Sequence, residues 1–465
     1  MKINFLNQYF KNRASDNNAS DLLNMYLEED KDQGKYNVIA LPTPGKTVFN
    51  SDAGSVVRGG IEHRGVAYFV VDDTFYSYTS NGTRTSRGTL NTSSGRIQLA
   101  SISNQIEIVD GTDIYNYNTG TTTFTTVSDA DRPSNPIGVT AQDEFFLIFC
   151  SNSSIVYGSD VADGTSFNAL SFSTKTGPGD YVNGLMSSNE ILHVFGTKTS
   201  DNWYNSGAAT FSFEPIGLGG FFHYGCIAPN SVAKGANTVF FLGQNEQGGY
   251  CVNMMDQYDV KPISNRAVDY QLSLLTTLTD AQGFCYKQSG HEFYVLTFPT
   301  EAKTFMYDAT TGLWSELQSY VSAAYTRDLA NCHVFCYGKN LVGAFNSGTI
   351  YYLDPTVYQE NGTAIKRRIV TPPGYAAGKK VFMDRLQVDL QTNVGSSLQI
   401  DLDVSKDSGV TYTAFASQNI PSTGGRMFWT RLGMTQNAFV LRLSTTSNSK
   451  FCVLGAVAEI RTGVH

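Results

Sequence analysis

The stretch Tyr68-Phe69-Val70-Val71-Asp72-Asp73-Thr74-Phe75-Tyr76-Ser77-Tyr78 decides the fold. Two apolar, aromatic-rich runs lie on either side of a short polar turn. Short runs of aromatic and β-branched residues that flank an Asp-containing turn predict a β-hairpin.

The same pattern recurs along the chain. Its second clear copy is Ile106–Tyr117, and 38 residues separate Asp72 in the first turn from Asp110 in the second. Looser copies lie near residues 145–157, 191–204, 238–252, 293–307 and 341–353. Hairpins that recur about every 40–50 residues are typical of propeller blades, each of which needs a neighbour on both faces. The sequence therefore predicts a β-propeller with six or seven blades; an irregular set of hairpins or two sandwiches is the alternative.

The pattern changes after residue 355. Alternation becomes regular in Leu386–Leu390, Leu398–Val404 and Phe439–Leu443, where every second side chain is apolar. One wet face and one buried face indicate antiparallel sheets, most simply a sandwich. The predicted class is therefore all-β, a propeller with a C-terminal antiparallel β-sandwich-like platform domain.

The predicted organisation has four parts and one helix. Residues 1–50 form an N-terminal arm packing on the platform, residues 51–360 the propeller, residues 361–378 a linker, and residues 379–465 the platform. Ser264 could cap a helix that runs to about Leu278 on the flank of the propeller.

Composition agrees with short strands and polar turns. The chain of 465 residues contains 26 Tyr and 29 Phe, and only 16% of its residues are charged. Its formal net charge of −8 argues against a sequence-wide basic footprint for nucleic acid. The first residues lack the apolar segment of a signal peptide, and no run of about 18 apolar residues predicts a membrane span.

No catalytic, cofactor-binding or metal-binding residues are assigned, and we expect the protein not to be an enzyme. The seven scattered cysteines are best explained as buried free thiols. Cys332 and Cys336 flank His333, but no second pair follows at zinc-ligand spacing. The segment Gly374–Lys380 only faintly resembles a phosphate loop, because three residues separate its glycines and Lys380 stands where Ser or Thr should be.

One motif suggests a rival function. Ser405–Tyr412 matches the Asp-box of sialidase-type propellers, in which the Asp carboxylate accepts turn amides and the Gly permits positive φ. The motif stabilises a hairpin and is not itself catalytic. It leaves open a glycan-binding or glycan-cleaving propeller, although it occurs once and in the platform.

Several segments, in order, resemble the tail hub proteins of short-tailed phages, also called packaged-DNA-stabilisation or nozzle proteins. These segments are Asn24-Met25-Tyr26 with Glu28, Leu41–Gly45, Phe195-Gly196, Asn202–Gly207, Gly225–Ala233, Phe241–Gly243 with Gly248, Ile263-Ser264 with Ala267-Val268, Gly290–Leu296, and Tyr307–Gly312 with Trp314. They cover about two-thirds of the chain. Two positions depart from the family: Asn202 stands directly before the Trp, where an acidic residue is common, and Phe241 stands where a Trp is common.

The resemblance implies a structural virion protein of the tail, made in the host cytoplasm. It implies a homohexameric ring beneath the portal and its adaptor, through which double-stranded DNA passes without sequence-specific binding. It also implies a surface that carries spikes, fibres or a needle. We further expect the side chains that line the channel to be mainly acidic or polar, since such a lumen does not grip phosphate.

Overall fold

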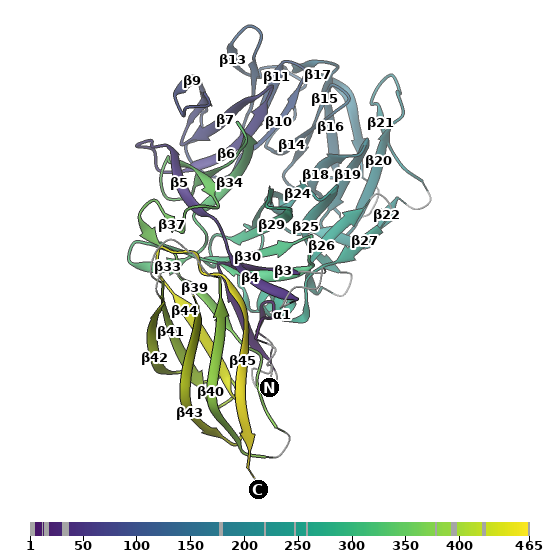
Figure 1. Cartoon of the computed structure of the whole chain (residues 1–465). Coiled ribbons are helices and arrows are strands. Elements are labelled where there is room, and N and C mark those ends of the chain that lie inside the picture. The colour runs from purple at the N-terminus through teal and green to yellow at the C-terminus, as the bar shows by residue number, and fades with distance from the viewer. Residues whose placement is uncertain are drawn as a thin grey trace.

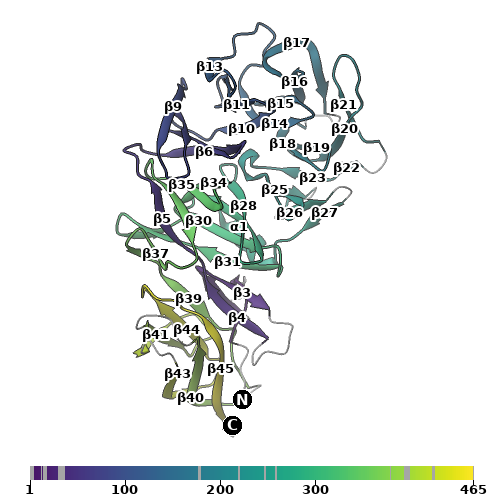
Figure 2. The same ribbon diagram turned by 45° about the horizontal axis from the view of Figure 1, so that its top comes forward.

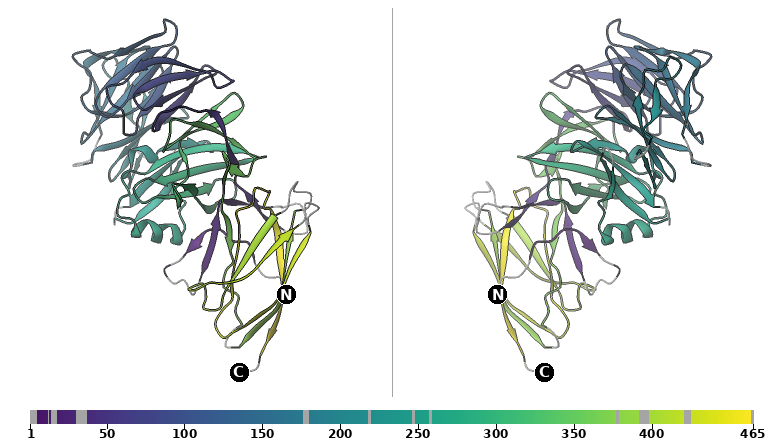
Figure 3. Two further views of the ribbon diagram at one scale, coloured as in Figure 1. Left: turned by 90° about the vertical axis from the view of Figure 1, so that its left-hand side faces the viewer. Right: turned by 90° about the vertical axis from the view of Figure 1, so that its right-hand side faces the viewer.

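In the computed structural model, the chain forms a ring of antiparallel sheets, the propeller, and a two-sheet sandwich beside it, the platform (Figure 1). Figure 3 shows the platform strands extending away from one side of the propeller. The structure describes residues 5–11, 13, 18–29, 37–175, 180–217, 220–245, 248–256, 259–376, 379–391, 398–420 and 425–463.

Seven blades follow one another around the ring (Figure 2). Blades 1 to 3 are β6 (Val57–His63), β7 (Val66–Val71), β8 (Thr74–Tyr78) and β9 (Arg84–Thr89); β10 (Gln98–Ile102), β11 (Gln105–Val109), β12 (Ile114–Asn118) and β13 (Thr123–Thr126); and β14 (Pro136–Gln142), β15 (Phe145–Cys150), β16 (Ile155–Asp160) and β17 (Asp163–Thr174). Blades 4 and 5 are β18 (Val182–Ser188), β19 (Ile191–Gly196), β20 (Ser200–Asn205), β21 (Phe213–Pro215) and β22 (Phe221–Phe222); and β23 (Tyr224–Cys226), β24 (Ala233–Gly235), β25 (Thr238–Asn245), β26 (Tyr250–Asp256) and β27 (Asp259–Pro262).

Blades 6 and 7 complete the ring. Blade 6 is β28 (Gln282–Gln288), β29 (His291–Phe298), β30 (Lys303–Asp308) and β31 (Leu313–Leu317); blade 7 is β34 (Ala330–Cys336), β35 (Lys339–Ala344), β36 (Ile350–Asp354) and β5 (Gly45–Asn50), to which β37 (Gln359–Glu360) and β38 (Thr363–Ala364) are added. The hairpin β32 (Ser319–Val321) and β33 (Ala324–Thr326) connects these two blades. All seven predicted hairpins are the second and third strands of a blade, which confirms the propeller.

Burial on both faces explains the apolar run that begins the first hairpin. Tyr68 and Val70 of β7 belong to a core shared with blade 2, whereas Phe69 and Val71 belong to a core shared with blade 7. A strand that is buried on both faces needs a continuous apolar run. Each large apolar side chain fully buried in this way stabilises the fold by about 1.5–3 kcal/mol.

Strand β5 closes the ring. It comes from the N-terminal end of the chain and pairs antiparallel with β36, with Val48 opposite Tyr351 and Lys46 opposite Leu353. Blade 7 therefore joins segments about 300 residues apart in the sequence, and the ring cannot open without separating them.

Blade 5 contains the two departures from a regular blade. Its innermost strand is divided into β23 and β24 by a 3-10 turn, Pro229–Ser231. Helix α1 (Arg266–Leu274) follows its outermost strand, and the helix is capped by Asn265, whose side chain accepts hydrogen bonds from two backbone amides. The predicted helix is confirmed, but it starts one residue later than predicted, because Asn265 and not Ser264 supplies the cap, and it ends earlier, at Leu274.

The platform is a sandwich of two sheets. One sheet contains β1 (Phe10–Lys11), β2 (Ala19–Leu23), β39 (Arg367–Val370), β44 (Val440–Thr445), β41 (Leu398–Ser405) and β42 (Thr413–Ile420); the other contains β3 (Met25–Glu29), β4 (Val38–Pro42), β45 (Val453–Thr462), β40 (Val381–Leu390) and β43 (Arg426–Thr435). The alternating apolar residues of β40, β41 and β44 meet in one core, as the sequence predicts.

The structure places two segments differently from the predicted organisation. Strand β5 lies in blade 7, so the N-terminal arm predicted for residues 1–50 ends inside the propeller. Strand β39 lies within the linker predicted for residues 361–378, because it pairs with both β2 and β44. Both segments are short, and their partners are distant in sequence, so local pattern does not reveal their pairing. The division into four domains stays a prediction.

Candidate functional site: the propeller axis and its junction with the platform

Polar side chains gather where the innermost strands of the propeller begin. We call this set the axial collar, and it consists of Arg96, Gln98, Asn183, Asn230 and Asn331. Arg96 Nη1 donates to the Asn331 carbonyl oxygen at 2.8 Å, and Asn331 Nδ2 donates to the carbonyl oxygen of Val57 at 2.8 Å. Asn183 Nδ2 donates to the Cys226 carbonyl oxygen at 2.8 Å. These bonds link blade 2 to blade 7, blade 7 to blade 1, and blade 4 to blade 5.

One collar bond crosses the axis. Gln98 Nε2 of blade 2 donates to Asn230 Oδ1 of blade 5 at 3.2 Å, and Gln98 Oε1 accepts from the backbone amide of Val139. A cavity of about 170 Å³ lies here, lined by the inner strands of six blades. At about 30 Å³ per water it holds roughly five waters. The axis of this propeller is therefore a small polar cavity, too narrow to admit a DNA duplex.

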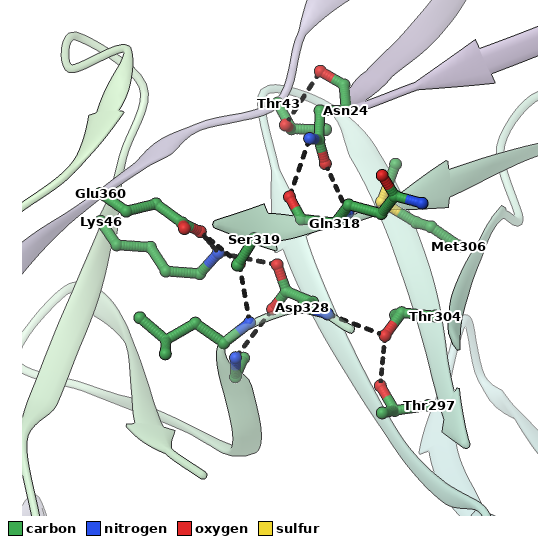
Figure 4. Close-up of polar contacts among 12 residues, drawn as sticks. Asn24, Thr43, Lys46, Thr297, Thr304, Met306, Gln318, Ser319, Asp328 and Glu360 are labelled. Carbon is green, nitrogen blue, oxygen red and sulfur yellow. Dashed lines mark hydrogen bonds and ion pairs between the residues drawn. The ribbon is translucent and has the colours of Figure 1, made fainter. Parts of the chain in front are cut away.

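A buried ion cluster lies where blade 7 meets blade 6 (Figure 4). Lys46 Nζ of β5 donates to Asp328 Oδ2 at 2.7 Å and also to Glu360 of β37. All three side chains are nearly excluded from solvent. Burial lowers the pKa of Lys46, but the carboxylates of Asp328 and Glu360 outweigh it, so that the pKa is raised above its ordinary value. Lys46 is therefore charged and holds two otherwise uncompensated carboxylates.

Further hydrogen bonds extend this cluster into blade 6. The Asp328 amide donates to Thr304 Oγ1 at 3.0 Å, and Ser319 Oγ donates to Glu360 Oε1 at 2.8 Å while accepting from the Leu329 amide. Figure 4 shows the chain of contacts running from Lys46 to Thr297. Through Lys46, the strand that closes the ring is thus tied to Asp328, in the segment between blades 6 and 7, and Asp328 is bonded in turn to Thr304 of blade 6.

Asn24 connects the propeller to the platform. Its side chain donates to the carbonyl oxygen of Gln318 at 2.9 Å and accepts from the Gln318 amide at 2.9 Å (Figure 4). It also donates to the carbonyl oxygen of Lys366 at 2.8 Å. Its φ of 51° lies in the left-handed region, which Asn tolerates better than most residues. Beside it, Leu23 of β2 pairs in parallel with Glu316 of β31, so blade 6 and one platform sheet form a single hydrogen-bonded sheet.

Close packing of the backbone explains why a glycine occupies position 45, at the end of the segment Leu41–Gly45. A Cβ there would lie 2.6 Å from the carbonyl oxygens of Val357 and Gln359, closer than such atoms can approach. The Gly45 amide donates to the Val357 oxygen at 2.8 Å. Asn24 and Gly45, both in segments that carry the family resemblance, therefore build the junction. Sequence reasoning assigned them no role, and it missed Lys46, Asp328 and Glu360, which have no local pattern.

Charge is divided unequally between the two parts of the chain. Residues 1–360 contain 21 Lys and Arg against 35 Asp and Glu, a formal net charge of −14. Residues 361–465 contain 12 against 6, a net charge of +6. The acidic character of the whole protein therefore comes from the part that contains the propeller, while the C-terminal part is basic.

The motifs weighed from the sequence occupy separate places. Cys332 and Cys336 belong to the core between blades 7 and 1, whereas His333 stacks on Phe284 of blade 6, so the strand directs them to opposite faces. All seven cysteines are free, and all but Cys285 are buried. In the part of the chain that the structure describes, no three His, Cys, Asp or Glu residues group as metal ligands do. No helix among the described residues has the length and apolarity needed to cross a membrane.

The other two motifs lie in the platform. Gly374 forms an isolated bridge with Phe439, and residues 377 and 378 of the faint phosphate loop lie outside the described residues. Lys380 precedes a strand, β40, instead of a helix. In the Asp-box, Asp407 accepts from Ser405 Oγ at 2.6 Å and from the Thr411 amide at 2.9 Å, and Gly409 has a φ of 96°. These hydrogen bonds of Asp407 thus remain within its own loop, as expected for a structural turn.

A comparison with known protein families agrees with this architecture. A family model described as Bacteriophage P22 Gp10, beta-propeller, matches residues 2–358. No curated protein matches the chain significantly. The solved structures similar to it include the computationally designed Ika8 protein, with 12% identity, a TM-score of 0.39, and coverage of 72% of this chain and 100% of that chain. They also include the WD40 domain of Neurospora crassa Pan2, with 8% identity, a TM-score of 0.43, and coverage of 67% and 96%. Because the family model spans most of the sequence, the chain belongs to the phage stabilisation family, the packaged-DNA-stabilisation β-propellers that include bacteriophage P22 Gp10.

Proposed function

We propose that this protein is the tail hub, or nozzle, of a short-tailed phage. In this function it closes the channel beneath the portal and its adaptor, retains the packaged DNA, and lets it pass on ejection. It also carries tail appendages such as spikes, fibres or a needle. The function is structural, with no catalytic, cofactor-binding or metal-binding residues.

The observation that carries this proposal is the family match, which covers a propeller whose ring is closed. Strand β5 and the Lys46 cluster close the ring, and the Gln98–Asn230 bond crosses its axis. A DNA duplex does not fit the axial cavity, so the channel must lie between subunits. We therefore expect several copies, in the homohexamer that the family resemblance implies, to surround the DNA.

A ring of this kind uses heterologous contacts, in which different surfaces of neighbouring copies meet and the rotation closes. The single sheet shared by blade 6 and the platform supports this use, because a rigid subunit keeps the rotation between copies constant. The predicted division into arm, propeller, linker and platform belongs to this proposal, with β5 reassigned to the propeller.

The charge distribution supports a channel that does not grip DNA. The part of the chain that contains the propeller carries −14. An acidic lumen repels phosphate and a neutral one does not attract it, so the duplex can slide. We therefore propose that propeller surfaces face the DNA and that the basic C-terminal part contacts other proteins. A continuous ring of Lys and Arg around the assembled axis would contradict this arrangement.

The test is genome retention by particles that lack this protein. We expect such particles to package DNA and then lose it, and we expect the purified chain added back to restore retention. The matched variant is Lys46→Met, which should fail to restore it if the locked ring is needed, beside Lys287→Met, an exposed cation that should restore it. Particles that retain their genome without the protein would refute the proposal.

The rival function, glycan binding or cleavage, predicts turnover on sialosides or aryl glycosides. The local hydrogen bonds of Asp407 favour a structural turn over this reading. We expect no turnover in such a screen.

A further inference from the structure

Two guanidinium groups meet at one residue of the axial collar. Arg96 Nη1 donates to the Asn331 carbonyl oxygen at 2.8 Å and to the Arg58 carbonyl oxygen at 3.0 Å. Arg327 Nη2 reaches Asn331 Oδ1 at 3.4 Å. The two arginines come from blade 2 and from the segment that leads into blade 7, and they lie on the two ends of the same asparagine.

Both arginines have few oxygen acceptors. Arg58, which lies close by and is almost fully buried, directs its guanidinium to five oxygen acceptors. Arg96 has two protein oxygen acceptors, both at Nη1, and a further side-chain hydrogen bond with Cys332. Arg327 has one distant acceptor and a buried Nη1 with none among the described residues, and its Cζ lies 4.0 Å from the centroid of the Phe345 ring. A guanidinium has five N–H donors, so most donors of this pair have no protein oxygen.

Carboxylates do not fill this gap. Within the described part of the chain, neither arginine forms an ion pair, and no carboxylate lines the axial cavity. Burial is the largest effect on the pKa of Arg327 and lowers it; Arg96 also lowers it, whereas Asp328 and Asp280 raise it, and together these effects bring the pKa to about 10. Asp328 is already paired with Lys46. Two like charges that interact in a partly desolvated site are costly without an anion.

The cavity gives an anion room. Arg96 lines the space of about 170 Å³, together with the amides of Gln98 and Asn230. That volume suits one small oxyanion with a few waters, at about 30 Å³ per water, and excludes a nucleic-acid strand. Guanidinium groups bind oxyanions through paired N–H donors, which matches the donors left over here.

We propose that the axial cavity is a binding site for a small tetrahedral oxyanion such as inorganic phosphate, held by Arg96 and by the amides of Gln98 and Asn230, which line it. The bound anion offsets the charge of Arg96 and ties blades 2 and 5 together at the axis. Because such a ligand binds the folded chain and not the unfolded chain, it stabilises the propeller by mass action. This site is independent of the function in the virion.

The test is calorimetric titration of the purified full-length chain with inorganic phosphate, at neutral pH and at an ionic strength held constant with chloride. We expect one saturable site per chain and a rise in melting temperature with phosphate that chloride does not reproduce. Arg96→Met should weaken phosphate binding at least about tenfold, a change that corresponds to about 1.4 kcal/mol. Arg96→Lys, which keeps the charge but loses the fork, should have an intermediate affinity.

Arg426→Met is the matched control, because Arg426 is an exposed cation of the platform and lies outside the cavity. It should bind phosphate as the wild type does. The proposal is wrong if the wild type shows no saturable phosphate binding, or if Arg96→Met binds as well as the wild type.

A second measurement serves if Arg96→Met does not fold. Crystals of the wild-type chain soaked in selenate should show an anomalous peak beside the Arg96 guanidinium. A map with no peak at the axis, or with peaks only on the outer surface, would overturn the proposal.

Discussion

Lys46 and Asp328 form an ion pair across the seam that closes the propeller, with 2.7 Å between Lys46 Nζ and Asp328 Oδ2 and side chains only 6% and 8% exposed. The two residues are 282 positions apart in the sequence. Lys46 belongs to β5, the strand that closes blade 7, and Asp328 precedes β34, the first strand of that blade. This ion pair therefore joins the two segments that close the ring, and a substitution can test it.

Replacing Lys46 with Met should destabilise the protein by about 3–5 kcal/mol, because it leaves Asp328 and Glu360 buried without a cation. Chemical denaturation measures the free energy of unfolding. Lys287→Met is the control, since Lys287 is 75% exposed and pairs with Glu292, and it should change stability by less than about 0.5 kcal/mol. Equal effects of the two substitutions would contradict the importance given to the seam.

Gly45→Ala should cost about 1–3 kcal/mol, because the added methyl group meets the carbonyl oxygens of Val357 and Gln359. The matched change is Gly217→Ala, where the added Cβ would meet no atom within 4 Å. Thermal unfolding compares the two variants. If Gly45→Ala has the same melting temperature as Gly217→Ala and the wild type, then β5 does not approach residues 357–359 closely.

Glu107 gives a prediction for pH. It is fully buried in blade 2, neither carboxyl oxygen has a hydrogen-bond partner among the described residues, and burial raises its pKa well above the ordinary value. The folded state therefore holds this proton more tightly than the unfolded chain. The contribution of Glu107 to stability is fully present below about pH 4.3, the ordinary pKa of Glu, and is lost as pH rises toward its raised folded-state pKa. Glu107→Gln should remove this loss, which amounts to at most about 1.4 kcal/mol per pH unit. Denaturation curves across pH that run parallel for wild type and variant would contradict it.

Asp407 should show the opposite dependence. Hydrogen bonds from Ser405 and Thr411 lower its pKa to about 2, so its contribution is present above the unfolded value of about 3.9 and is lost as pH falls through about 2. Asp407→Asn should lower stability at neutral pH by less than about 1 kcal/mol, because the carboxylate is partly exposed and screened by solvent. The difference from wild type should vanish in acid; a difference that persists at the lowest pH would exclude this origin.

The seven hairpins could be predicted because each one is local: two apolar runs and a turn lie within a dozen residues, as in Tyr68–Tyr78. The platform core could be predicted for a similar reason, since its alternation appears within single strands such as Leu398–Ser405. What escaped prediction joins distant segments. Strand β5 has no hairpin partner beside it, and β39 resembles a linker because both of its neighbours lie elsewhere in the chain.

The functional junction escaped for the same physical reason. Lys46 sits among ordinary polar and apolar residues, and only the fold brings it to Asp328 and Glu360. Arg96 likewise follows a Ser/Gly-rich turn and reads as a surface cation, yet it lines the axis. The family resemblance did mark two members of the junction, Asn24 and Gly45, although it gave no reason for them.

The central claim is that this protein is a hub that assembles under the portal. Its most direct test is the mass of the purified full-length chain, measured alone and with portal–adaptor complexes. We predict that six copies join each complex in a closed ring and that no ring forms with an unrelated portal. A chain that stays monomeric in the presence of its portal and adaptor would contradict the claim.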